Sequence, residues 1–352
     1  MHQEEKDATL MKVLVTGASG FIGSFIVEHA LGLGWTVWAA VRKTSSRTWL
    51  RDSRIRFIEL ELNSREALKA SLSRFKQEEG SWDYIVHAAG ATKAKDEAAF
   101  FKANNEATRN LVESLTELGM IPKCFIYMSS LSVAGAIKEQ PKPQADGCTY
   151  EELRADDTPW PNTAYGRSKW AAEQYLRTTR IPWVILRPTG VYGPRERDYF
   201  LMVKSIRRHI DFSVGFRPQE ITFIYVKDVV QAVFLSLTHA DKTIGNTYLL
   251  SDGNTYSSRT FSEYARKSLG IRHLLHVTAP LWMLHLVCTC GELSARLTGN
   301  ITALNKDKYR ILKQRNWRCD ITPMLALGFK PRFDLERGVG NTVSWYKQSK
   351  WI

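Results

Sequence analysis

The chain has 352 residues, of which 44% are hydrophobic and 24% are charged. This composition is typical of a globular protein that buries a core without disulfides or a structural metal. Lys and Arg total 49 against 36 Asp and Glu, which gives a net charge of +13. The basic residues are spread along the chain without a long Lys/Arg run, so the charge does not indicate a nucleic-acid-binding protein.

The cysteines indicate a compartment rather than a site. There are 5, scattered along the chain, and an odd set of this kind is typical of free thiols in a reducing environment. We therefore expect a cytoplasmic protein. Cys288 and Cys290 form a single CxC pair with no partner pair, so no metal site is predicted.

Two segments bear on targeting and membranes. Residues 1–10 are polar and predict an N-terminal tail rather than a signal peptide. The most apolar later stretch, 277–290, is interrupted by Pro280 and His285 and falls short of the ~20 residues that span a bilayer. No integral membrane segment is predicted. We interpret the stretch first as a buried helix, second as a substrate lid and third as a contact with a membrane surface.

Strand and helix patterns alternate from residue 12 onward. Short apolar runs predict strands at 12–16, 35–41, 55–60, 84–88, 124–129, 183–187, 221–226 and 247–250. Helical spacing follows at 22–31, 64–75, 104–118, from 164 and at 228–237. This alternation predicts an α/β fold, a Rossmann-type doubly wound parallel sheet.

The same pass along the chain suggests a domain organisation. We expect the tail over 1–10, a dinucleotide-binding domain over 11–190 to which 221–250 returns, and a smaller, discontinuous C-terminal substrate-binding region. That region consists mainly of 191–220 and 251–352, where the pattern becomes irregular. Residues 136–162 are rich in Pro, Asp and Glu and predict a long loop over the site.

The strongest local signal is a glycine-rich loop between the first strand and the first helix. Glycine permits unusual backbone angles and a close approach to a pyrophosphate, while the helix N-terminus offers amides to an anion. The loop therefore predicts a dinucleotide site. Its cofactor-binding residues are Gly17, Ser19, Gly20, Phe21, Ile22 and Gly23.

The end of the second strand bears on the choice between NAD and NADP. An acid there would bind the ribose hydroxyls of NAD, but the sequence reads Val41-Arg42-Lys43. Because Arg42 can face a 2′-phosphate, NADP is favoured, with NAD as the alternative. We place Glu61 and Leu62 near the adenine.

The fourth strand closes with small residues, and this pattern is typical of backbone beside a cofactor. The residues concerned are Ala88, Ala89 and Gly90. His87, which precedes them, is interpreted as a packed histidine rather than a catalyst.

A tyrosine and a lysine at helical spacing suggest acid–base chemistry. Tyr165 and Lys169 are four residues apart and lie on one helix face. A nearby ammonium would lower the pKa of a tyrosine from its usual value of about 10. Ser130 at the end of the fifth strand would hydrogen-bond the substrate oxygen, with Ser129 and Ser132 as further candidates.

These motifs together resemble the extended short-chain dehydrogenase/reductase family, also described as the NAD-dependent epimerase/dehydratase family. The resemblance rests on TGASGFIG at 16–23, HAAG at 87–90, SSLSVAG at 129–135, YGRSK at 165–169 and RPTGVYGPR at 187–195. It also includes IYVKDVVQA at 224–232 and LGFKP at 327–331.

The resemblance implies roles for individual residues. Ser130, Tyr165 and Lys169 would be catalytic, and Asn104 would support the site. Arg187, Pro188 and Val191 would border the cofactor and the substrate. The resemblance also implies a homodimer, in which helices around 97–118 and 164–179 form a four-helix contact.

Departures from the family pattern limit the class of substrate that we expect. Ser130 is followed by Leu131 and Ser132 where sugar dehydratases usually carry Thr-Asp-Glu, and Ile221-Thr222 stands where many nucleotide-sugar enzymes have Arg-Asp. Together with the absent strand-two acid and the apolar segment 280–297, this looks like the dihydroflavonol reductase and 3β-hydroxysteroid dehydrogenase branch. A small, apolar, steroid- or flavonoid-like alcohol or ketone is therefore the expected substrate.

Two alternatives remain open. The first is a nucleotide-sugar epimerase or dehydratase that retains NAD through its cycle. The second is a cofactor-sensing protein without turnover, since such proteins can keep the Ser–Tyr–Lys set.

Overall fold

The computed structural model describes the backbone of residues 11–298 and 305–352, and side chains up to 292 and from 305 onward. The predicted tail over 1–10 lies outside the described residues. So do the side chains of the apolar segment beyond 292.

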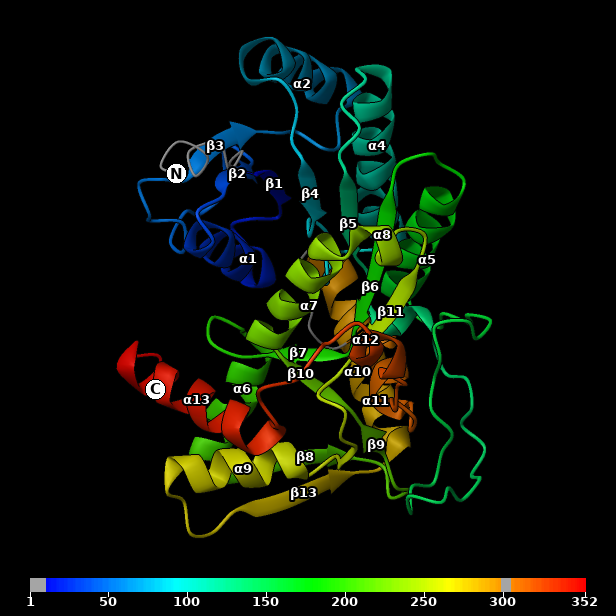
Figure 1. Cartoon of the computed structure of the whole chain (residues 1–352). Helices are drawn as coiled ribbons and strands as arrows, with labels where there is room; N and C mark the ends of the chain where they lie inside the picture. The colour runs from blue at the N-terminus through cyan, green and yellow to red at the C-terminus, as the bar shows by residue number, and fades with distance from the viewer. Residues whose placement is uncertain (1–10, 299–304) are drawn as a thin grey trace.

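A parallel sheet forms the centre of the molecule (Figure 1). It is 7-stranded, in the order β11-β6-β5-β4-β1-β2-β3, and each neighbouring pair is parallel. The strands are β1 (Lys12–Thr16), β2 (Thr36–Val41), β3 (Arg56–Glu59), β4 (Tyr84–His87), β5 (Cys124–Met128), β6 (Trp183–Pro188) and β11 (Thr247–Leu250). The predicted doubly wound parallel sheet is confirmed.

Helices cover both faces of this sheet, so the sheet separates two hydrophobic cores, one on each face. On one face, α1 (Phe21–Gly32) packs against α7 (Val226–Thr238). On the other lie α2 (Arg65–Glu79), α4 (Ala107–Glu117) and α5 (Ala164–Arg177). Because the inner strands are buried on both faces, their residues form nearly continuous apolar runs, whereas the edge strand β3 is largely exposed.

The helix predicted over 104–118 is wrong in its start and its regularity. It begins earlier, as α3 (Glu97–Phe101), and passes through a π-helical turn at Lys102–Glu106 before α4. Single π turns inside helices are frequent at functional sites, because the extra residue re-aims a side chain. Here the turn carries Asn104.

The second half of the chain builds a separate core around short sheets. The strand predicted at 221–226 becomes β10 (Phe223–Tyr225), which pairs with β7 (Gly190–Tyr192) rather than with the large sheet. A third apolar cluster joins these strands to three helices at the lower end of Figure 1, α6 (Asp198–Arg207), α9 (Thr260–Leu269) and α13 (Leu335–Gln348).

Several elements of this half were not predicted. They include the parallel pair β8 (Ile210–Val214) and β13 (Leu275–Ala279), the antiparallel pair β9 (Glu220–Ile221) and β12 (Tyr256–Ser257), and the short helices α8 (Ala240–Thr243), α11 (Lys306–Lys313) and α12 (Thr322–Ala326). In the first half, a 3-10 turn at Leu131–Val133 was not predicted either. Strands as short as β9 carry no readable period, so sequence patterning does not reveal them.

The apolar stretch after Pro280 forms α10 (Leu281–Thr298). Its first interpretation as a buried helix holds only for Leu284 and Cys288 among the described side chains, since Trp282 is 70% exposed and Leu286 57% exposed. Within the described part of the chain, no helix is long and apolar enough to cross a membrane.

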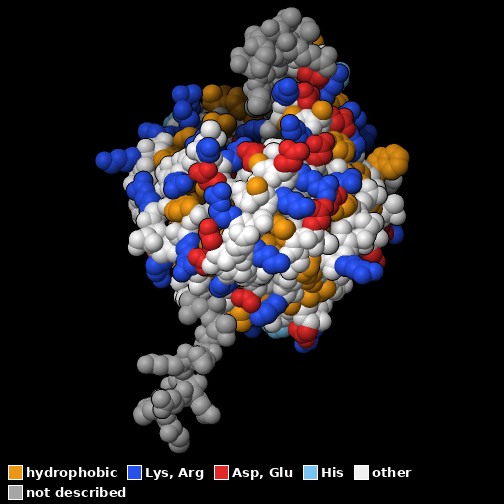
Figure 2. All heavy atoms as spheres, turned by 90° about the horizontal axis from the view of Figure 1, so that it is seen from above, with side chains coloured by type: hydrophobic (Ala, Val, Ile, Leu, Met, Phe, Trp, Pro, Cys, Tyr) orange, Lys and Arg blue, Asp and Glu red, His pale blue; other side chains and the backbone are white. Residues whose placement is uncertain are grey.

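The charge on the surface is mixed rather than segregated. Figure 2 shows Lys and Arg side chains interspersed with Asp and Glu across the face that it presents. Many of the cations pair with neighbouring carboxylates, as Arg54 does with Asp52 and Arg65 with Glu113. The net charge of +13 therefore forms no single block on this face.

Candidate active site

The loop between β1 and α1 brings backbone atoms into unusually close contact. Gly17 has a φ of +66°, and a Cβ there would lie 2.7 Å from the carbonyl carbon of Ala88. A Cβ on Gly23 would lie 2.2 Å from the Gly17 carbonyl oxygen. No side chain caps α1 at Gly20, so its first amides remain available to an anion. This cradle fits the pyrophosphate of a dinucleotide.

The remaining loop residues frame the helix start. Ser19 is half-buried, and Phe21 and Ile22 pack against the sheet core. The Phe21 ring meets Phe25 edge-on, with 6.1 Å between ring centroids. These contacts fix the direction of α1 toward the loop.

The predicted adenosine residues follow the neighbouring strands. Arg42 comes directly after β2 and is exposed, and its amide donates to the Ser45 hydroxyl at 3.0 Å. Glu61 is also exposed, while the Leu62 carbonyl accepts from the Asn110 side chain at 2.9 Å. Because β1, β2 and β3 are parallel neighbours, these residues reach the same sheet edge as the glycine loop.

His87 at the end of β4 is a structural residue. It is fully buried between two hydroxyls, with Thr16 2.7 Å from Nδ1 and Thr108 3.0 Å from Nε2. Burial lowers its pKa to about 3, so it stays neutral at physiological pH. This geometry fits the interpretation of a packed histidine.

The segment after His87 lies against the centre of the site. Ala88 and Ala89 run beside Gly17, and a Cβ on Gly90 would lie 2.7 Å from Asn104 Oδ1 and 3.1 Å from Lys169 Nζ. Only glycine fits at position 90 without displacing these two polar groups.

Asn104 ties this segment to α5. Its Oδ1 accepts from the Ala91 amide at 2.8 Å, and its Nδ2 donates to the Ala91 carbonyl at 3.1 Å and to Ser168 Oγ at 2.9 Å. Since Asn104 is 1% exposed and these bonds are internal, it positions backbone rather than acting on a substrate.

Ser130 and Tyr165 meet at the start of α5. Thr163 caps this helix by accepting from the Gly166 amide at 3.0 Å, which places Tyr165 in its first turn. Burial raises the pKa of Tyr165, and a hydrogen bond with Ser130 opposes the rise. Ser130 Oγ also accepts from the Ser132 amide at 3.1 Å, which fixes its position.

Lys169 lies one turn farther along α5. Its Nζ donates to the Met128 carbonyl at 2.8 Å and sits 4.8 Å above the Tyr127 ring. Burial lowers the pKa of Lys169 to about 8, and the charge of Glu173 opposes this shift. The expected lowering of the Tyr165 pKa by Lys169 is therefore not what this structure shows, because burial of the phenol dominates.

A buried charge network behind the site was missed at the sequence level. Arg187 on β6 binds Glu173 with both ends of its fork, Nε to Oε1 at 2.9 Å and Nη2 to Oε2 at 2.6 Å. The two side chains are 1% and 0% exposed. Ser129 donates to the same carboxylate. The spacing of four residues between Lys169 and Glu173 was the signal that could have revealed it.

This network engages two side chains that the sequence analysis assigned to the site. Ser129 is occupied by Glu173 and is not free to bind a substrate oxygen. The guanidinium of Arg187 is likewise engaged by Glu173. Pro188 is buried at the end of β6, and Val191 on β7 packs against the core of the large sheet.

The base of the long loop over 136–162 approaches the start of α5. Gly135 and Trp160 form a bridge there, next to Pro161, whose Cβ would lie 3.2 Å from a Cβ on Gly166. The middle of the loop instead packs on the C-terminal segment, where Leu153 pairs with Cys319. The loop is therefore anchored both near the candidate site and on the C-terminal segment.

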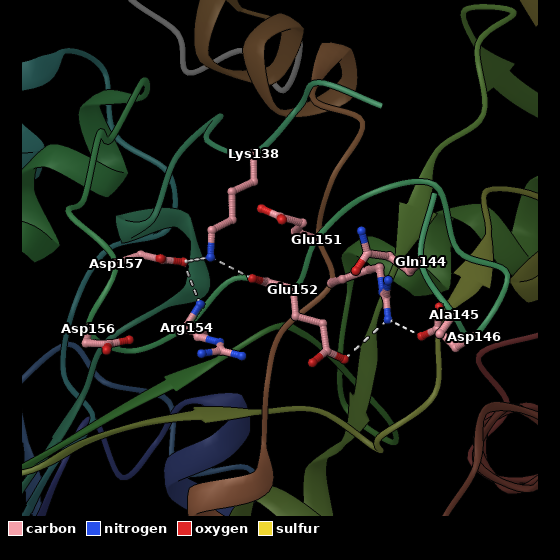
Figure 3. Close-up of a pocket in the computed structure, with 10 residues that line it drawn as sticks. Lys138, Gln144, Ala145, Asp146, Glu151, Glu152, Arg154, Asp156 and Asp157 are labelled. Carbon is pink, nitrogen blue, oxygen red and sulfur yellow. Dashed lines mark hydrogen bonds and ion pairs between the residues drawn. The ribbon is translucent and has the colours of Figure 1, made fainter. Parts of the chain in front are cut away.

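This loop and Arg318 line a polar pocket of about 640 Å³ that is open to solvent (Figure 3). Lys138 pairs with Asp157 at 2.7 Å, and Arg318 pairs with Asp146 and Glu152. Because these charges neutralise each other and no proposed catalytic or cofactor residue lines the pocket, it is separate from the candidate site. Within the described residues, no group of three or more His, Cys, Asp or Glu could hold a metal ion.

Known proteins are similar to this chain over nearly its whole length. The sequence model of the NAD dependent epimerase/dehydratase family matches residues 13–251. A sterol-4-alpha-carboxylate 3-dehydrogenase (decarboxylating) of Candida albicans is 23% identical, covering 97% of this chain and 99% of its own. A ceramide reductase of Caulobacter vibrioides is 24% identical, covering 97% and 96%.

A solved structure agrees in fold. The UDP-glucose 4-epimerase of Thermus thermophilus in complex with NAD superimposes with a TM-score of 0.72 at 21% identity, covering 96% of this chain and 99% of its own. The family model spans well over half of the chain and includes both the glycine loop and the Tyr165 helix. The chain therefore belongs to the NAD dependent epimerase/dehydratase family and is an enzyme of the NAD-dependent dehydrogenase and epimerase type.

Proposed function

We propose that this enzyme catalyses reversible hydride transfer between a nicotinamide cofactor and an alcohol or ketone on a small apolar molecule. The observation that carries the proposal is the contact of Ser130 with Tyr165, one helical turn from Lys169. Gly90 joins this group to the glycine loop, because its neighbours are Lys169 and Asn104 on one side and the Ala88–Ala89 backbone on the other.

Each side chain has a distinct role in the proposed reaction. A bound nicotinamide supplies or accepts the hydride. Tyr165 gives a proton to the substrate oxygen, or takes one from it, as general acid or base. The raised pKa of Tyr165 keeps the phenol protonated near neutrality, which suits proton donation during reduction. Ser130 donates a hydrogen bond to the same oxygen and stabilises its developing charge.

Lys169 and the network behind it hold this group in place. Lys169 is fixed by the Met128 carbonyl, and its positive charge faces the buried Glu173 carboxylate. Because Glu173 is itself held by Arg187, the end of β5 and the middle of α5 are locked together.

An apolar substrate is supported by sequence and by relatives. Leu131 and Ser132 follow Ser130, so the acid pair that sugar dehydratases use there is missing. Two relatives that match nearly their whole length are named for a sterol and a ceramide, both apolar lipids. We propose a steroid-like or lipid-like alcohol or ketone.

NADP is the proposed cofactor form, with NAD as the alternative. The support is Arg42, which is exposed at the sheet edge that the 2′-position of the ribose would face. Fluorescence titration tests this point. We expect tighter binding of NADPH than NADH, and loss of that preference in Arg42→Ala but not in Arg208→Ala, which removes an exposed arginine elsewhere. Preference for NADH in the unmodified protein would contradict it.

A nucleotide-sugar epimerase is the second candidate. It is favoured by a UDP-glucose 4-epimerase of Vibrio cholerae that is 24% identical over 96% of both chains. Such an enzyme would convert a nucleotide sugar without net consumption of cofactor. Copurification of tightly held NAD would favour this candidate.

We further propose a reducing cytoplasmic setting and a homodimer. All five cysteines are free, which supports the first point. For the dimer, α3 and α4 lie beside α5 and offer the two-helix surface that a four-helix contact requires. We also propose that the core around β7, β10, α9 and α13 belongs to the substrate-binding region.

Replacement of one oxygen atom tests the catalytic assignment. Tyr165→Phe should lower turnover by at least about 100-fold while NADPH binding is kept, because only the proton donor is lost. Tyr175→Phe is the matched control, since it makes the same change on the same helix, at a ring stacked under Arg109. Near-normal turnover in Tyr165→Phe would refute the assignment.

A further inference from the structure

One helix of the second half turns apolar side chains outward. On α10, Trp282 is 70% exposed, Leu286 57%, Val287 44% and Met283 37%. Residues 282 and 286, and likewise 283 and 287, are four apart and share one side of the helix. The helix is attached through Leu284 instead, which is 8% exposed.

The apolar surface extends beyond the helix. β8 pairs in parallel with β13, and the Gly215 amide donates to the Ala279 carbonyl at 2.9 Å. Phe216 therefore lies next to Pro280, where α10 begins, and it is 79% exposed. We call this surface the α10 apolar face; it consists of Phe216, Trp282, Met283, Leu286 and Val287.

Cations border this face. Arg217 follows Phe216 and is exposed, and Arg259 reaches the Thr278 hydroxyl at 3.3 Å on the strand that leads into α10. On the side of α11, the His285 and Tyr309 ring centroids are 4.9 Å apart. Lys313 Nζ lies 6.0 Å from the centroid of the same tyrosine ring. The chain as a whole carries a net charge of +13.

An apolar helix face with an exposed tryptophan and a basic border is complementary to an anionic lipid surface. Tryptophan favours the bilayer interface, and each nearby cation adds attraction to acidic headgroups. A soluble protein rarely leaves such a group of large apolar side chains exposed without a partner. We propose that the α10 apolar face docks this enzyme on the surface of an anionic membrane.

The docking surface adjoins the candidate site. Asp307, at the start of α11, accepts from the Ala164 amide at 2.7 Å, directly before Tyr165. α11 in turn packs against α10. An apolar substrate dissolved in the membrane would thus reach the enzyme beside α5, which carries Tyr165. This route for the substrate rests on the proposed function, whereas membrane docking itself does not.

Vesicle flotation of the full chain tests the proposal. We expect the protein to float with phosphatidylcholine vesicles that contain phosphatidylglycerol, and far less with phosphatidylcholine alone. The double variant Trp282→Glu/Leu286→Glu should partition at least about tenfold more weakly, because two apolar side chains leave the interface. Leu33→Glu is the matched control, since Leu33 is 51% exposed at the end of α1 and should leave flotation unchanged.

A charge variant separates the electrostatic from the apolar contribution to vesicle binding. Arg217→Glu should weaken flotation with phosphatidylglycerol vesicles more than the residual binding to phosphatidylcholine. Circular dichroism and thermal melting confirm that each variant is folded.

Three results would overturn the proposal. They are no flotation of the unmodified protein, equal flotation of the double variant, and a dimer that the double variant abolishes without any vesicle binding. The last would assign the face to a second copy of this chain. Tyr165→Phe separates membrane binding from catalysis, since this variant should float normally whether or not the proposed function is correct.

Discussion

The buried pair of Glu173 and Arg187 gives the sharpest prediction on stability. Glu173→Gln keeps the side-chain shape but removes the charge that neutralises Arg187, which is 1% exposed. Removing one partner of a buried ion pair costs about 3–5 kcal/mol, because the other charge stays in the interior. With an unfolding entropy of about 2.1 cal/mol/K per residue, Tm of the 352-residue chain should fall by about 4–7 °C.

Calorimetry or a circular-dichroism melt measures this change, with two comparisons. Asp52→Asn breaks the exposed pair with Arg54, which water and salt screen, and should leave Tm nearly unchanged. The double variant Glu173→Gln/Arg187→Met removes both charges and should regain most of the lost Tm. A loss below about 1 kcal/mol in Glu173→Gln, or a double variant less stable than the single one, would refute this reasoning.

Two further predictions concern the cofactor loop and pH. Gly23→Ala should weaken NADPH binding at least about tenfold, since the added Cβ would lie 2.2 Å from the Gly17 carbonyl oxygen. Gly32→Ala on the same helix is the control, because its Cβ meets no atom within 4 Å and NADPH should bind normally. Equal NADPH titration curves for the two variants would contradict the assignment of the glycine loop to the cofactor. Folding lowers the pKa of His87 from 6.5 to about 3, so the unfolded chain takes up the proton first as pH falls. The contribution of His87 to stability is complete above pH 6.5 and is lost toward pH 3 by up to about 1.4 kcal/mol per pH unit. Urea titrations should show a shallower pH dependence in His87→Asn, and an unchanged slope would count against this assignment.

Sequence patterning predicted the large sheet well, because buried parallel strands are short apolar runs separated by turn residues. Strands 12–16 and 247–250 match β1 and β11 residue for residue. The two-residue strands β9 and β12 carry no period, and only tertiary pairing defines them. The π turn around Asn104 was equally invisible, because it adds one residue to a helical pattern without altering composition.

In the candidate site too, the local motifs could be predicted from the sequence, and the contacts that depend on tertiary packing could not. The glycine loop and the spacing of Tyr165 and Lys169 depend on local geometry, so sequence alone suggests them. The roles of Ser129 and Arg187 depend on Glu173, which approaches them only when α5 packs beside β5 and β6. The exposure of Trp282 likewise follows from which side of α10 meets the core, and its apolar neighbours in sequence gave no sign of that.

Cofactor stoichiometry tests the central claim most directly. The purified enzyme is incubated with NADPH and, in turn, with steroid and long-chain ketones and with UDP-sugars, while product and cofactor are both quantified. We expect one NADPH to be oxidised for each apolar ketone reduced, and near-complete loss of this reaction in Tyr165→Phe. Conversion of a UDP-sugar with no net oxidation of cofactor would contradict it and assign the site to an epimerase.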